Sequence, residues 1–211
     1  MERVSKSVGD KDVEEIVEKL YGDFIERIFP RLQGIYDEGK RYLFFIAWLN
    51  SAFEQMGIGR IVVTGGFAVE IYTGRVYRTM DVDVIVEGEK ARKVLELFLE
   101  RFSERIGRGF LPTYEILQLK SIDIVSTVYR RRAQPTKIII DNQHAYLEPI
   151  EELIIMYLVG WKYWGSTEDR DKAYWLYAMW KDRIDQSYLD ARAREENVED
   201  HLEILRGMQT P

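Results

Sequence analysis

Apolar residues near the N-terminus recur with the helical period of 3.6, which predicts two amphipathic helices. The first follows Asp10, a residue type that often caps helices, and we expect it to end by Pro30. The second covers Phe44 to Met56 and is expected to stop at Gly57, because glycine commonly ends helices. The pattern therefore predicts that packed helices come before any strand.

The period then changes to that of β-strands. The β-branched run Ile61 to Val63 predicts a short strand that ends in Thr64-Gly65-Gly66, and a helix follows up to Gly74. A second strand is predicted at 81–86, and the apolar positions between 91 and 102 predict the helix after it. Further strands are predicted at 115–120, 122–128 and 137–140.

From Pro149 onward the apolar residues form helical stripes at 150–161, 173–184 and 198–205. This order of elements predicts an α+β fold, with a mixed β-sheet, flanking helices and a C-terminal helical region. We divide the chain into an N-terminal helical extension (1–40), a core (41–148) and the C-terminal helical region (149–211).

Composition narrows the chemistry. The 211 residues are 46% apolar and include no cysteine, which excludes disulfides, thiol nucleophiles and Cys-type zinc sites. The groups that remain for catalysis or binding are carboxylates, hydroxyls, Lys, Arg and two histidines. Neither histidine has a second His or Cys at metal-ligand spacing. No apolar run approaches the ~20 residues that span a bilayer, so we expect a cytoplasmic protein without a membrane partner. The net charge of -6 argues against a nucleic-acid coat bound through bulk positive charge.

Two acids share one face of the second predicted strand. Strand alternation places Asp81 and Asp83 together, while Val82 and Val84 face the other way. Carboxylates about 6.6 Å apart repel by roughly 2.5 kcal/mol at an effective dielectric of 20. A divalent cation such as Mg²⁺ would offset this repulsion. The alternative is an exposed edge strand with two solvated acids.

Three further features surround this pair in the sequence. Gly65-Gly66 lies between a strand and a helix, where backbone N–H groups can hold phosphate, although a plain turn has the same pattern. Arg78 and Thr79 come shortly before Asp81, with Met80 between, and the guanidinium of Arg78 could meet a triphosphate or only form a salt bridge. Asp123 alternates with isoleucines on a later predicted strand. It could be a third metal ligand or a general base, or it could simply be an exposed strand position.

Basic residues are concentrated after this strand. Between Lys120 and Lys137 there are five basic residues and one acid, a local charge of +4 that includes Arg130, Arg131 and Arg132. The segment could receive an RNA acceptor or a triphosphate, or it could be a solvated hairpin turn. The aromatic stretch 163–177 is interpreted as packing between helices, with base stacking as the alternative.

The run from Val63 to Val84, together with Asp123, resembles the nucleotidyltransferase superfamily of DNA polymerase beta-like fold. Within it, the Gly-Gly-x-Ala and Arg-Thr-x-Asp-x-Asp forms are similar to small prokaryotic nucleotidyltransferases related to AbiEii-type toxins, over about residues 60 to 180. The resemblance implies that Gly65 and Gly66 hold the nucleotide phosphates. It also implies that Asp81 and Asp83 bind metal, and that Asp123 completes the metal site and helps to activate the acceptor hydroxyl.

One position departs from this family. The helix after the core commonly carries a phosphate-contacting lysine where this chain has Tyr157, and we expect Lys162 to substitute for it. In Asp169-Arg170-Asp171, similar to an Arg-Asp pair of relatives, Arg170 could approach a phosphate, or the cluster could be a solvated helix start.

The resemblance implies a transferase that uses Mg²⁺ or Mn²⁺. It would move a nucleoside monophosphate from an NTP such as ATP to a hydroxyl of a tRNA end, a protein or a small molecule such as an aminoglycoside. A role as the toxin of a toxin–antitoxin pair, with an antitoxin as partner, stays open. Two rival hypotheses are an inactive nucleotide-binding or partner-binding member of the same fold, and a helical scaffold that forms a homodimer through its aromatic C-terminal region.

Overall fold

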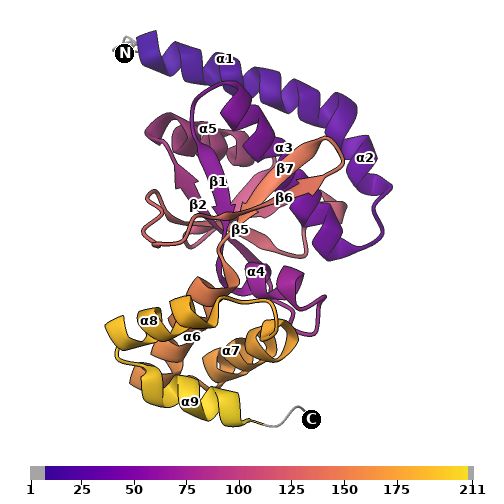
Figure 1. Ribbon diagram of the computed structural model, residues 1–211. Helices are drawn as coiled ribbons and strands as arrows, with labels where there is room; N and C mark the ends of the chain where they lie inside the picture. Colours follow the sequence, from indigo (N-terminus) through magenta and orange to yellow (C-terminus); the bar gives the residue numbers. More distant parts are fainter. Residues whose placement is uncertain (1–7, 209–211) are drawn as a thin grey trace.

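The computed structural model describes residues 8–208, which form one mixed β-sheet with helices around it (Figure 1). The strand order is β3-β4-β5-β2-β1-β7-β6. The pairs β1–β7 and β2–β5 are parallel, and the other neighbours are antiparallel. The predicted α+β fold with a mixed sheet is confirmed. In chain order the strands are β1 (Arg60–Val63), β2 (Asp81–Glu87), β3 (Ser103–Ile106), β4 (Gly109–Pro112), β5 (Ser121–Ser126), β6 (Thr136–Ile140) and β7 (Gln143–Leu147).

The N-terminal helices differ from prediction at both ends of the first. Helix α1 (Val8–Asp23) already contains Asp10, so this residue is not its cap. The helix continues through a π-helical segment (Phe24–Ile28) into α2 (Phe29–Gln33), and Pro30 does not end it. Proline is accepted there because it lies just after the π-helical segment, where the hydrogen-bond register of the helix changes. Helix α3 (Glu38–Gln55) is capped by the side chain of Asp37.

An aromatic cluster fixes these helices to the sheet. Phe24 is fully buried, and its ring lies 4.9 Å from that of Phe102 and 5.7 Å from those of Phe45 and Phe98, measured between centroids. Phe98 belongs to α5 (Glu89–Glu100), which packs against α1. The same apolar cluster continues from Val13 in α1 to the C-terminal helices. The boundaries proposed at residues 40 and 148 stay a prediction.

Two regions of the sheet were predicted poorly. Segment 115–120 is not a strand, because it holds a 3₁₀ turn (Glu115–Leu117) that leads into β5. The hairpin β3–β4 and strand β7 were not predicted. Most of β3 is exposed, and β7 begins with polar residues, so neither shows the alternation of a half-buried strand.

The C-terminal helices lie beyond one end of the strands, with α4 (Gly65–Tyr72) between them and the sheet (Figure 1). The three predicted helical stripes are present, and α8 was not foreseen. Most of the aromatic residues there pack against the core, whereas Tyr163 and Trp164 are exposed. No helix within residues 8–208 is both long and apolar enough to span a membrane. These helices are α6 (Ile150–Trp164), α7 (Thr167–Trp180), α8 (Gln186–Glu195) and α9 (Glu199–Gly207).

Candidate active site

Three acids predicted from the sequence lie on two adjacent strands. Strands β2 and β5 run parallel in a register that pairs Asp81 with Ser121 and Asp83 with Asp123. Between them, Val82 and Ile122 are fully buried in the core. The alternation of each strand thus turns the acids toward the opposite face of the sheet.

The glycine turn lies against this acid pair. Gly65 adopts a φ of +60°, and a Cβ built on it would lie 2.1 Å from Asp83 Oδ2. Only glycine fits without displacing the carboxylate. The backbone N–H of Gly66 donates a hydrogen bond to Asp83, which therefore occupies the N-terminus of α4. Backbone donors at a helix start are also the groups that hold a phosphate.

The electrostatics of this site are unfavourable without a cation. Burial, followed by the negative charges of Asp81 and Asp123, raises the pKa of Asp83 from 3.8 to about 6. Asp123 is packed equally closely, because a Cβ on Gly109 would lie 2.0 Å from its Oδ1. This Oδ1 atom is buried and has no hydrogen-bond partner among the described residues. The site thus holds carboxylates that repel each other, and one of their oxygens, Asp123 Oδ1, has no hydrogen-bond donor among the described residues.

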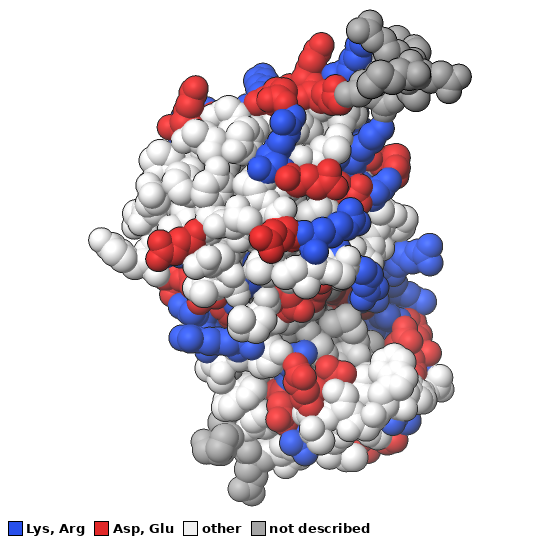
Figure 2. Space-filling view, turned by 180° about the vertical axis from the view of Figure 1, so that it is seen from behind, with Lys and Arg blue, Asp and Glu red and all other residues white. Residues whose placement is uncertain are grey.

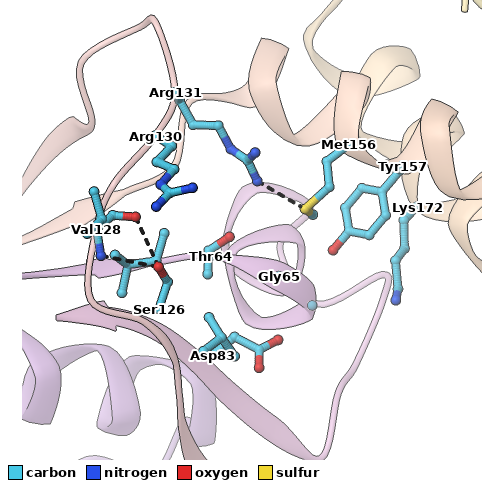
Figure 3. Close-up of a pocket in the computed structure, with 13 residues that line it drawn as sticks. Thr64, Gly65, Asp83, Ser126, Val128, Arg130, Arg131, Met156, Tyr157 and Lys172 are labelled. Atoms are coloured by element: carbon cyan, nitrogen blue, oxygen red, sulfur yellow. Dashed lines mark hydrogen bonds between the residues drawn. The ribbon is translucent and has the colours of Figure 1, made fainter. Parts of the chain in front are cut away.

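A cavity of about 490 Å³ opens beside Asp83 and the glycine turn (Figure 3). One end holds Asp83, Gly65 and Lys172, and aliphatic side chains and Arg130 line the other. The volume suits a bound small molecule. The full lining is Thr64, Gly65, Gly66, Asp83, Ile85, Val125, Ser126, Val128, Arg130, Arg131, Met156, Tyr157 and Lys172.

Lys172 was missed by the sequence reasoning. It projects from α7 into the cavity, 2.9 Å from Glu168 Oε1, and its Nζ lies 5.1 Å from the centroid of the Tyr157 ring and 5.0 Å from that of Tyr77. Its positive charge opposes the rise in the pKa of Asp83. A signal existed, because the short Gly165–Ser166 connection makes α6 and α7 antiparallel neighbours. A lysine early in α7 can therefore reach the space beside Tyr157.

The lysine expected from the resemblance lies elsewhere. Lys162 donates to the backbone oxygen of Asn197 at 2.6 Å and pairs with Asp200 at 2.8 Å, and it does not line the cavity. Arg78 is exposed and is likewise absent from the lining. Thr79 is closer to the acids, since its hydroxyl donates to Asp81 Oδ1. The structure thus brings together the acids, the glycines and Thr79, but not Arg78 or Lys162.

The basic segment is less free than its sequence charge of +4 implies. Lys120 is buried and ion-paired inside the protein, Arg131 pairs with the buried Glu148, and Arg132 pairs with Glu195. Arg130 lines the cavity and has no ion pair within residues 8–208. Figure 2 shows basic and acidic side chains side by side where the sheet half meets the helical half. Three of these cations thus face acids of the same chain, which neutralise part of the local charge of +4.

The acids fit a divalent cation that is shared with substrate. Within residues 8–208, no three His, Asp or Glu side chains form a ready-made metal-binding group. Mg²⁺, however, commonly takes one or two carboxylates together with substrate phosphates. The unpartnered Asp123 Oδ1 and the hard oxygen donors of Asp81 and Asp83 match that requirement.

The fold that carries these acids and the strand–glycine–helix turn is similar to that of nucleotidyltransferase-like proteins. An antigenic nucleotidyltransferase-like protein from Paracoccidioides brasiliensis has a similar structure, with a TM-score of 0.53, 14% identity, and coverage of 77% of this chain and 91% of that one. ANT(2″)-Ia in complex with adenylyl-2″-tobramycin gives a TM-score of 0.47, 16% identity, and coverage of 74% and 97%. No protein-family model matches the sequence, and no curated protein does.

Proposed function

We propose that this protein transfers a nucleoside monophosphate from an NTP to a hydroxyl acceptor, as a nucleotidyltransferase of the EC 2.7.7 type. The observation that carries the proposal is Asp83, which lies against Gly65 and lines a cavity that also contains Lys172, with Asp81 and Asp123 beside it on β2 and β5. This combination places anion-binding and cation-binding groups side by side, as a metal–triphosphate substrate requires.

Mg²⁺ or Mn²⁺, held by Asp81, Asp83 and Asp123, would supply positive charge at the reacting phosphate. The N-terminus of α4 and the ammonium of Lys172 would bind the outgoing pyrophosphate oxygens. The carboxylate of Asp123, which pairs in register with Asp83, would accept the proton of the acceptor hydroxyl. The acceptor oxygen then bonds to the α-phosphorus as the bond from that phosphorus to pyrophosphate breaks.

Several narrower assignments belong to the same proposal. We infer that the chain is a small enzyme of the AbiEii-related kind and acts as the toxin of a toxin–antitoxin pair. Its acceptor is one of three classes: a tRNA end, a protein hydroxyl or a small molecule. The acids and the glycine turn are needed for all three, so the acceptor must be found by experiment.

The experiment incubates the protein and Mg²⁺ with each α-labelled NTP and, separately, with total tRNA, a protein lysate or an aminoglycoside. We expect label on one acceptor class, and none from an Asp81→Asn, Asp83→Asn double variant. Wild-type protein that leaves no label on any acceptor would refute the proposal. Tight ATP binding without metal or turnover, measured by calorimetry, would instead support the inactive nucleotide-binding member.

A further inference from the structure

A buried ion pair, Lys120 with Glu70, is connected through Thr79 to Asp81. The side chains of Lys120 and Glu70 are 2% and 0% exposed, and Lys120 Nζ lies 2.9 Å from Glu70 Oε2. Glu38 adds a second carboxylate, with its Oε1 at 3.2 Å from the ammonium. Burying an ion pair costs desolvation free energy that its attraction often fails to recover. The pair is therefore poorly explained as a means of stabilising the fold.

Both polar groups of one backbone residue are held by this pair. The N–H of Thr79 donates to Glu70 Oε2 at 3.1 Å, and the carbonyl oxygen of Thr79 accepts from Lys120 Nζ. The hydroxyl of the same residue donates to Asp81 Oδ1. A chain of direct contacts thus runs from the buried pair through Thr79 to a carboxylate of the proposed active site.

The pair also connects the three elements that carry the site. Glu70 belongs to α4, whose first residues are Gly65 and Gly66. Lys120 immediately precedes β5, the strand of Asp123, and its backbone N–H donates to the hydroxyl of the buried Tyr42 at 2.8 Å. The loop before β2, which carries Thr79, lies between them. One ion pair therefore fixes the glycine helix, the loop before Asp81 and the start of β5 relative to each other.

We propose that Lys120 and Glu70 are positioning residues, which hold Thr79 so that its hydroxyl orients Asp81 for nucleotidyl transfer. The proposal rests on the proposed function for its kinetic consequence, but not for its structural one. Lys120 and Glu70 do not touch substrate, because both side chains are buried and paired with each other. Outer groups that orient carboxylates in this way typically change activity or metal affinity by about 10–100-fold.

The test replaces the pair with apolar residues of similar size, Lys120→Met with Glu70→Leu. Both buried charges leave together, and Glu38 keeps its ion pair with Arg75, but the N–H and carbonyl of Thr79 lose their partners, so we expect the double variant to fold with a Tm modestly below that of wild type. Hydrogen exchange at the Thr79 amide should accelerate by at least about tenfold, since its acceptor is gone. The matched control, Arg206→Met with Asp190→Leu, removes an ion pair between α9 and α8 and should leave this amide unchanged.

Kinetics then test whether the pair acts through Thr79. We expect kcat of the double variant to fall about 10–100-fold while KM for NTP changes less than about twofold. Thr79→Val should give a similar loss, Thr79→Ser should retain activity, and Thr79→Val should add nothing in the double variant. If the losses multiply instead, or if kcat is that of wild type, the positioning role is wrong.

The two proposals fail in different ways. If the wild-type protein transfers no label, the proposed function fails, and hydrogen exchange still decides whether the pair fixes Thr79. Unchanged protection of the Thr79 amide in the double variant would overturn the positioning role, whatever the activity. Should the apolar double variant not fold, Lys120→Met with Glu70→Gln keeps a neutral acceptor for Thr79 N–H. Because the ammonium is still lost, we again expect reduced kcat, and wild-type kcat would overturn the proposal.

Discussion

Asp83→Asn should stabilise the metal-free protein while abolishing transfer. Burial and two neighbouring acids raise the pKa of Asp83 to about 6, so the folded state binds this proton more tightly than the unfolded chain does. Ionising the group above pH 6 therefore disfavours folding. The asparagine is nearly isosteric, and its carbonyl oxygen can still accept the hydrogen bond from Gly66 N–H.

The size of the effect follows from the pKa of Asp83. A rise from 3.8 to about 6 corresponds to at most about 3 kcal/mol. Because the side chain is partly exposed, solvent screening reduces this to roughly 1–2 kcal/mol. The penalty develops as the pH rises from about 4 to about 6 and is constant above that range. For a chain of this length, removing it should raise Tm by about 2–8 °C at pH 8, with little difference at pH 4.

Calorimetry of both proteins with EDTA, at pH 4 and pH 8, measures this difference. Asp182→Asn is the control, because Asp182 is exposed and lies outside the cavity, and its Tm should match wild type at both pH values. Added Mg²⁺ should raise the Tm of wild type and have little effect on Asp83→Asn. If the Tm of Asp83→Asn is at or below that of wild type at pH 8, the ionised Asp83 does not destabilise the folded protein and the reasoning is refuted.

The remaining predictions concern the turn, the cavity and the core. Gly65→Ala should lower Tm by about 4 °C or more and abolish transfer. The φ of Gly65 is +60°, and the new Cβ would lie 2.1 Å from Asp83 Oδ2. A Tm equal to that of wild type would contradict this. Lys172→Ala should raise KM for NTP about 10–100-fold, whereas Lys162→Ala should not change it. Tyr157→Lys should restore a low KM in the Lys172→Ala background, and no rescue would show that the two helices do not share this position. Phe24→Ala should lower the free energy of unfolding by about 3–5 kcal/mol in urea titrations, and a loss below about 1 kcal/mol would exclude Phe24 as the link between α1 and the core.

The sequence predicted the parts of the fold that have strong local patterns. β1, α4 and β2 were found because β-branched runs, a glycine turn and alternating acids follow directly along the chain. Strand β7 could not be predicted because its pairing with β1 is set by residues about 80 positions away. Its polar start resembles a loop. The segment from Glu115 looked like a strand from composition alone, but it forms a 3₁₀ turn.

The candidate site shows the same division. The acids and glycines could be predicted from the sequence. The acids alternate with apolar residues along strands, and the glycines directly follow a strand. Lys172 was missed, because its role depends on how α6 and α7 pack, for which the short connection between these helices is the one local signal. Lys120 was counted as part of an exposed basic segment, yet it is buried beside Glu70, which is 50 residues away in the chain. Charge composition shows how many cations a segment has, but not which of them face solvent.

The parallel register of β2 and β5 has a consequence for quality control of the folded chain. Val82 and Ile122 fill the core in the same register that pairs Asp83 with Asp123. A slip of one residue would bury carboxylates and expose isoleucine, so a molecule with misaligned acids would also lose its core. Misaligned chains would then unfold or be degraded. The population that stays folded would be uniform in the alignment of its acids.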